Sequence, residues 1–170
     1  NSLPDKFDIS VTSEIGELEG VILHTPGIEM ENMTPANAER ALYSDVLNLS
    51  VASAEYNQLK TVLEKTTNVF QVGDLLVDVL DNARVKSNLV EKICENENAE
   101  EIHDELLEMS KEELGRCLME GVLMKKDNLS RFLSNERYSL RPLHNFFFTR
   151  DLAVAINDWV LVSRMANKVR

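Results

Sequence analysis

The sequence predicts an α+β protein in which a block of helices interrupts two flanks that carry short strands. In the middle, residues 73–120, apolar side chains recur with the spacing of amphipathic helices. In the flanks, short apolar runs end at turn signals, as in residues 18–24, which stop before Thr25-Pro26-Gly27. The middle is also the acidic part, with a local net charge of −9 against −2 for the remainder.

The N-terminal flank is predicted to contain two strands and two helices. Residues 18–24 and 68–72 are apolar and β-prone, and each is expected to form a strand. Thr34 followed by Pro35 is typical of a helix start, because threonine caps the first turn and proline tolerates its first position. A longer helix follows, whose apolar face consists of Ala52, Tyr56, Leu59 and Leu63.

The acidic middle is predicted to form several helices. Its apolar positions begin with Leu75, Leu76, Val79, Leu80 and Ala83. Ser110, three residues before Glu113, indicates a capping box that opens a further helix. Another short helical face is formed by Leu129, Phe132 and Leu133.

In the C-terminal flank we expect a bulky strand at residues 146–149. A hairpin should follow, with strands at 153–156 and 159–162 around the two-residue turn Asn157-Asp158. The predicted organisation is therefore a first β-containing segment at 1–72, a helical insertion at 73–140 and a second β-containing segment at 141–170.

Composition excludes several partner classes. The 170 residues are 44% hydrophobic and 28% charged, which is typical of a globular protein. No apolar run approaches the ~20 residues that cross a bilayer, so no membrane partner is expected. A net charge of −11 repels nucleic acid and anionic lipid. With no secretory signal and with Cys94 and Cys117 interpreted as buried thiols, the cytoplasm is the expected location.

The remaining chemistry-bearing side chains favour structural roles. His103 stands beside two carboxylates, but consecutive residues on a helix do not share a face, so no metal site is expected there. His24 ends a predicted strand and is interpreted as structural. His144 is expected to make a local structural contact. Arg150 and Asp151 end an aromatic run, where a simple ion pair at a strand end is the plainest interpretation.

Residues 145–151, Asn-Phe-Phe-Phe-Thr-Arg-Asp, resemble the Asn-x-x-Phe-Thr-Arg-Asp signature of arginine deiminases. Residues 13–27 resemble the N-terminal signature of the same family. Further similarity lies, in the family's order, in residues 33–35, 74–76 and 164–170. A helical insertion after the first propeller segment is also typical of this family.

The resemblance implies a five-bladed, pentein-like α/β propeller around a central pocket. The implied reaction is the hydrolysis of L-arginine to L-citrulline and ammonia, with no metal or organic cofactor. A cysteine thiolate attacks the guanidinium carbon, ammonia leaves with a proton from a histidine, and water releases citrulline from the thiouronium intermediate. A covalent step suits this substrate, because a guanidinium is a weak electrophile.

The same resemblance implies four substrate-binding positions. Asp151 matches a carboxylate that clamps the guanidinium, and Asn145 matches an amide that recognises the amino-acid end. Phe148 should line the pocket beside the aliphatic stem. Arg170 matches an arginine that binds the substrate carboxylate, a bidentate task that suits a guanidinium fork.

The family's nucleophilic cysteine has no counterpart in these 170 residues, so we expect the chain by itself to be inactive. Two alternatives remain open. One is an amidinotransferase or another guanidine-modifying hydrolase of the same superfamily. The other is a non-catalytic helical interaction module, for which the strands serve only as scaffold. Self-association into a homo-oligomer is possible in either case, because incomplete sheets leave apolar faces exposed.

Overall fold

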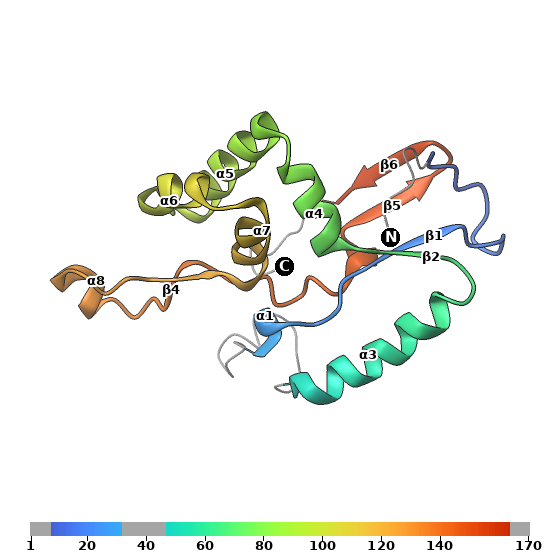
Figure 1. Ribbon diagram of the computed structural model, residues 1–170, viewed down its shortest axis with the longest axis horizontal. Coiled ribbons are helices and arrows are strands. Elements are labelled where there is room, and N and C mark those ends of the chain that lie inside the picture. The colour runs from blue at the N-terminus through green and yellow to red at the C-terminus, as the bar shows by residue number, and fades with distance from the viewer. Residues whose placement is uncertain (1–7, 32–46, 164–170) are drawn as a thin grey trace.

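A computed structural model describes residues 8–31 and 47–163 of the chain (Figure 1). Helices and three two-stranded sheets make up this part, and no sheet in it closes into a barrel. The predicted α+β class is therefore confirmed, whereas the propeller stays a prediction. The helix expected at Thr34 and Pro35 lies outside the described residues. Within them, no helix has both the length and the apolar character that a bilayer span requires.

The first sheet pairs β1 (Gly20–Leu23) with β2 (Asn68–Gln71) in parallel, in register from Gly20 opposite Asn68 to Leu23 opposite Gln71. Parallel strands need a long crossover, and α3 (Leu49–Leu63) lies within it. Asn48 caps α3, because its side-chain oxygen accepts hydrogen bonds from the first turn. Both predicted strands and the longer helix are thus confirmed.

The acidic middle of the helical insertion contains four α-helices among the described residues. They are α4 (Val72–Leu80), α5 (Ala83–Glu97), α6 (His103–Glu108) and α7 (Lys111–Glu120), with the 3₁₀ turn η1 (Glu100–Ile102) before α6. Ser110 caps α7 as predicted, by accepting a hydrogen bond from the backbone N–H of Glu113. Asn98 ends α5 in the left-handed conformation that asparagine tolerates.

These helices enclose the main apolar core. Its buried members are Leu80, Val90, Cys94, Ala99, Ile102, Leu106, Leu114, Leu118 and Leu140. Helices α4 and α7 approach closely at Gly115, where an added Cβ would lie 3.2 Å from a methyl group of Val77. The insertion therefore holds together by close apolar packing.

An extended arm leads away from this core (Figure 1). It consists of β3 (Val122–Leu123), α8 (Leu129–Leu133) and β4 (Tyr138–Leu140), with β3 and β4 antiparallel. The predicted short helix is confirmed as α8, but its apolar side chains are exposed.

The C-terminal hairpin matches its prediction. β5 (Ala153–Ile156) pairs antiparallel with β6 (Trp159–Val162), and the turn lies at Asn157 and Asp158. Asn157 has a φ of 53°, which asparagine adopts more readily than most residues. Val11 forms an antiparallel bridge with Asn157.

The strand predicted at residues 146–149 is wrong. This stretch is a turn followed by the 3₁₀ helix η2 (Thr149–Asp151). The aromatic rings pack on different neighbours instead of alternating across a sheet. Phe146 lies against His24, and Phe147 packs against the buried Met30 and in part on Phe148. Tertiary contacts thus override the β-propensity of the aromatic run.

Candidate functional site

Two segments that overlap the family-like signatures at residues 13–27 and 145–151 lie against each other. Residues 20–31 comprise β1 and the short helix α1 (Ile28–Glu31), and residues 144–151 carry the Thr-Arg-Asp signature. We call these two segments together the signature junction. His144 Nδ1 donates to the backbone carbonyl of Glu29 at 2.6 Å, and the hydroxyl of Thr149 donates to the carbonyl of Ile22 at 3.0 Å.

A ring contact adds a third tie between the two segments. The His24 and Phe146 rings have centroids 5.0 Å apart and are tilted by 60°. This distance lies in the usual range for interacting aromatic pairs. The contacts at residues 144, 146 and 149 thus fasten the signature segment along its length.

Three of the four predicted substrate-binding residues lie on this segment. The backbone N–H of Phe148 donates to the carbonyl of Asn145 at 3.0 Å, and that of Asp151 donates to the carbonyl of Phe148 at 3.2 Å. Because each bond closes one turn, the three residues occupy successive turns of a compact stretch. Arg170 lies outside the described residues.

The environments of these three residues differ. Asn145 is buried, whereas Phe148 and Asp151 are exposed. A carboxylate that clamps a cation tightly needs to be shielded from water, because solvent weakens the attraction. The described residues do not enclose Asp151, so its role as a clamp stays a prediction.

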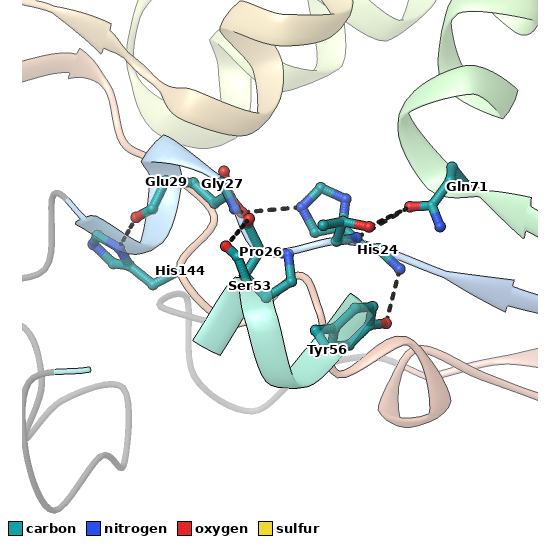
Figure 2. Close-up of polar contacts among 9 residues, drawn as sticks. His24, Pro26, Gly27, Glu29, Ser53, Tyr56, Gln71 and His144 are labelled. Carbon is teal, nitrogen blue, oxygen red and sulfur yellow. Dashed lines mark hydrogen bonds and ion pairs between the residues drawn. The ribbon is translucent and has the colours of Figure 1, made fainter. Parts of the chain in front are cut away.

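A buried carboxylate lies behind the signature segment (Figure 2). Glu29 is 3% exposed, and its Oε1 accepts hydrogen bonds from the backbone N–H of Gly27 at 2.7 Å and from His24 Nε2 at 3.0 Å. Burial by itself would raise the pKa of Glu29, but the hydrogen bonds from His24 and Gly27 outweigh it and lower the pKa. Glu29 is therefore held in its charged form.

The loop before α1, residues 24–27, is also fastened to α3 and β2 (Figure 2). Tyr56 on α3 accepts a hydrogen bond from the backbone N–H of His24, and Ser53 on the same helix donates to the carbonyl of Pro26. Gln71 at the end of β2 accepts from both the backbone N–H and the hydroxyl of Thr25. Burial raises the pKa of Tyr56, so its hydroxyl stays protonated.

Sequence reasoning missed this arrangement in two ways. Glu29 was not predicted to have any role, and the contact expected of His144 is not local, since its partner Glu29 lies 115 positions earlier. His24 is structural, as predicted, through its hydrogen bond to Glu29. The available signal was the spacing of His24 and Glu29 on either side of a Pro-Gly turn inside the N-terminal signature.

Neither cysteine is suited to act as a nucleophile. Cys94 is buried and Cys117 is only partly buried, so the prediction of two buried thiols holds for Cys94 alone. Burial raises the pKa of both thiols, which lowers their thiolate fraction.

His103 Nδ1 lies 2.9 Å from Asp104 on the surface. In residues 8–31 and 47–163, no cluster of three or more His, Cys, Asp or Glu could hold a metal ion.

Comparison with known proteins agrees with the resemblance seen in the signatures. The family model described as arginine deiminase matches residues 39–170. Arginine deiminase of Listeria monocytogenes is 31% identical over 175 residues, which cover 95% of this chain and 43% of the relative. Arginine deiminase of Bacillus cereus is 30% identical over 179 residues, which cover 97% of this chain and 44% of the relative.

The chain thus spans less than half the length of these relatives. The family model nevertheless covers well over half of the chain, including the whole helical insertion and the Thr-Arg-Asp signature. The chain belongs to the arginine deiminase family.

Proposed function

We propose that this chain is the N-terminal, substrate-binding part of an enzyme that hydrolyses L-arginine to L-citrulline and ammonia. The observation that carries the proposal is the signature junction, where segments that include parts of the two family-like signatures meet. His144, directly before Asn145, donates a hydrogen bond to α1, and Thr149, between Phe148 and Asp151, donates one to β1. Family membership supports the reaction class.

In this proposal the substrate is held at both ends. The carboxylate of Asp151 pairs with the planar guanidinium through charge-assisted hydrogen bonds, which fix the orientation of its carbon. Asn145 and Arg170 recognise the amino-acid end of arginine. Phe148, whose side chain is 43% exposed, covers the aliphatic stem.

The nucleophile is proposed to come from the rest of the enzyme. A thiolate forms a C–S bond with the guanidinium carbon, the C–N bond breaks, and ammonia leaves with a proton supplied by a histidine. Water then replaces the sulfur and releases citrulline. Cys94 lies in the core of the helical insertion with a raised pKa, and it does not suit this role.

The proposal extends to the fold, the cellular location and the cofactor requirement of the enzyme. Segments 1–72 and 141–170 would belong to a five-bladed propeller, with 73–140 as a helical insertion. The whole enzyme would work in the cytoplasm without a metal or organic cofactor, and it could self-associate. The two-stranded sheets support the need for further strands, because a sheet of two strands is marginally stable on its own.

Product analysis tests this proposal. The full-length protein should release citrulline and ammonia in equal amounts from L-arginine, and the 170-residue chain should release none above the buffer rate. Robust turnover by the 170-residue chain would refute the placement of the nucleophile. Transfer of the amidino group to an added amine, without ammonia, would instead indicate an amidinotransferase. Parallel assays with agmatine and methylarginine would identify another guanidine-modifying hydrolase.

A further inference from the structure

We propose that Glu29 is a positioning residue for the substrate-binding segment 144–151. It would hold Asn145, Phe148 and Asp151 in place without touching the substrate itself. This inference rests on the proposed function, since it concerns the same site. It adds a residue that neither signature-based prediction nor the chemistry of the guanidinium group identifies.

The first step of the argument is the alternation of anchors and proposed binding residues. The anchors are His144, Phe146 and Thr149, each of which contacts β1, its C-terminal neighbour His24 or α1. The proposed binding residues fall between or beside these anchors along the chain. A segment fastened at three points over six residues has little freedom to change its backbone, so its binding groups are held in place before substrate arrives.

The second step is that Glu29 controls two of these anchors. Its backbone carbonyl accepts the hydrogen bond from His144, the residue directly before Asn145. Its carboxylate holds the ring of His24, which in turn packs against Phe146. One buried residue thus supports the start of the signature segment twice, at His144 through its backbone and at Phe146 through its side chain and His24.

The third step is that the carboxylate holds the turn before α1 together. It accepts hydrogen bonds from Gly27 and from His24, and all three groups belong to one short turn. Glu29→Ala would leave these two donors without their acceptor in a largely buried place. Buried donors without partners are costly, so the turn would rearrange until water or another acceptor reached them. The carbonyl of Glu29 would then move away from His144.

Direct participation of Glu29 in chemistry is disfavoured by the geometry. Its side chain is 4% exposed, and its Oε1 is engaged by Gly27 and His24. A general base must reach the proton that it abstracts. Glu29 therefore acts through other residues.

The test uses the full-length protein and four variants: Glu29→Ala, Glu29→Gln, Thr149→Val and Val90→Ala. Glutamine keeps an acceptor oxygen at the same place, so Glu29→Gln should restore most of the function. Thr149→Val removes a different anchor with little change of volume. Val90→Ala is the matched control, because Val90 is fully buried in the helical insertion and lies outside the junction.

Glu29→Ala should lower kcat/KM for arginine by about 10- to 100-fold, mainly through a higher KM, since small displacements of binding groups have effects of this size. Agmatine lacks the carboxylate of arginine, so its turnover should fall less, and the preference for arginine over agmatine should narrow. Thr149→Val should also lower kcat/KM, raise KM and narrow the preference for arginine over agmatine, but by smaller factors. Glu29→Gln should stay within about threefold of the wild type. Val90→Ala should lower the Tm and leave KM unchanged.

Hydrogen exchange provides a readout that does not depend on activity. In Glu29→Ala, the amides of Phe146, Phe148 and Asp151 should exchange faster while those of α5 stay protected, and Val90→Ala should show the reverse. Unchanged KM and exchange in Glu29→Ala would overturn the inference, as would equal loss of function in Glu29→Gln. If Glu29→Ala does not fold, a further variant, His24→Ala, which removes the ring held by the Glu29 carboxylate, decides by the same two readouts. Absence of citrulline from the wild type would refute the proposed function, while exchange would still decide the role of Glu29.

Discussion

The helical insertion and the signature junction bury different kinds of side chain. The apolar core of the insertion contains nine buried side chains among the described residues, all of them apolar or a thiol. At the junction, the buried apolar side chains are Leu23, Pro26 and Met30, whereas the four buried polar or charged side chains of the described residues all lie there. Those four are His24, Glu29, His144 and Asn145.

The two kinds of burial have different effects: one stabilises the fold, and the other fixes the positions of groups. Apolar burial is non-directional and stabilises a region in proportion to the area removed from water. Hydrogen bonds among buried groups contribute less net stability but require defined distances and angles. The insertion is therefore expected to supply stability, and the junction to supply the accuracy with which the proposed binding residues are placed.

The largest effect on the free energy of unfolding should come from a cavity in the helical insertion. Leu114 on α7 is fully buried, so Leu114→Ala should lower the free energy of unfolding by about 2–5 kcal/mol. Leu133→Ala on α8 is the matched control, because Leu133 is 70% exposed and its loss should change the free energy of unfolding by less than ~0.5 kcal/mol. Urea unfolding followed by circular dichroism measures both. Equal effects of the two substitutions would contradict the packing described for the insertion.

A smaller effect is expected when steric bulk is added at the junction. A Cβ at Gly27 would lie 2.6 Å from Oε2 of Glu29, and the other oxygen of that carboxylate is held by His24. Gly27→Ala should therefore lower the free energy of unfolding by about 1–3 kcal/mol. Gly16→Ala is the control, since its Cβ would meet only ordinary contacts with Ser13. Thermal unfolding of the two variants should separate them, and indistinguishable Tm values would mean that Glu29 is not held rigidly.

Acid should affect the junction through Glu29. Its pKa is lower in the folded protein than its ordinary value of 4.5, so its charge stabilises the fold above that pH. This contribution is lost as the pH falls below 4.5 and through the folded-state pKa. Glu29→Gln should remove that part of the pH dependence and flatten the acid side of the stability curve. An unchanged slope below pH 4.5 in the variant would contradict the charged state assigned to Glu29.

The smallest expected effect concerns thiol reactivity. Cys94 belongs to the core of the insertion and has a pKa raised first by burial and then by the charges of Glu100 and Glu101. Cys117 is only partly buried, and Arg116 offsets part of the rise in its pKa. At pH 7, labelling by a thiol reagent should therefore be slow at both sites and slower at Cys94. Faster reaction of Cys94 would indicate that the insertion opens readily.

The same comparison explains what the sequence could predict. Helical periodicity and the cap at Ser110 identify the insertion because they are local signals, and the Asn157-Asp158 turn identifies the hairpin for the same reason. The strand expected at residues 146–149 fails because its conformation depends on rings that contact distant residues. No local pattern reports a hydrogen bond between His144 and Glu29, which lie 115 positions apart.

At the candidate site, too, local sequence patterns identify residues but not their distant contacts. Asn145, Phe148 and Asp151 could be named from a short motif, and the structure connects them by successive backbone hydrogen bonds. The buried contacts of Glu29 and His24 that hold this segment could not be predicted, because they depend on how β1, α1 and the signature segment meet. The enclosure that the proposed clamp at Asp151 requires is likewise not specified by the motif.

The most direct test of the account is the effect of Asp151 on arginine hydrolysis by the full-length protein. Asp151→Ala removes the proposed partner of the guanidinium and should cost roughly 3–5 kcal/mol, which is about two to three and a half orders of magnitude in kcat/KM. Asp158→Ala, at an exposed aspartate in the β5–β6 turn, serves as the control and should leave kcat/KM unchanged. A kcat/KM near the wild-type value in Asp151→Ala would contradict the assignment of the signature segment to substrate binding.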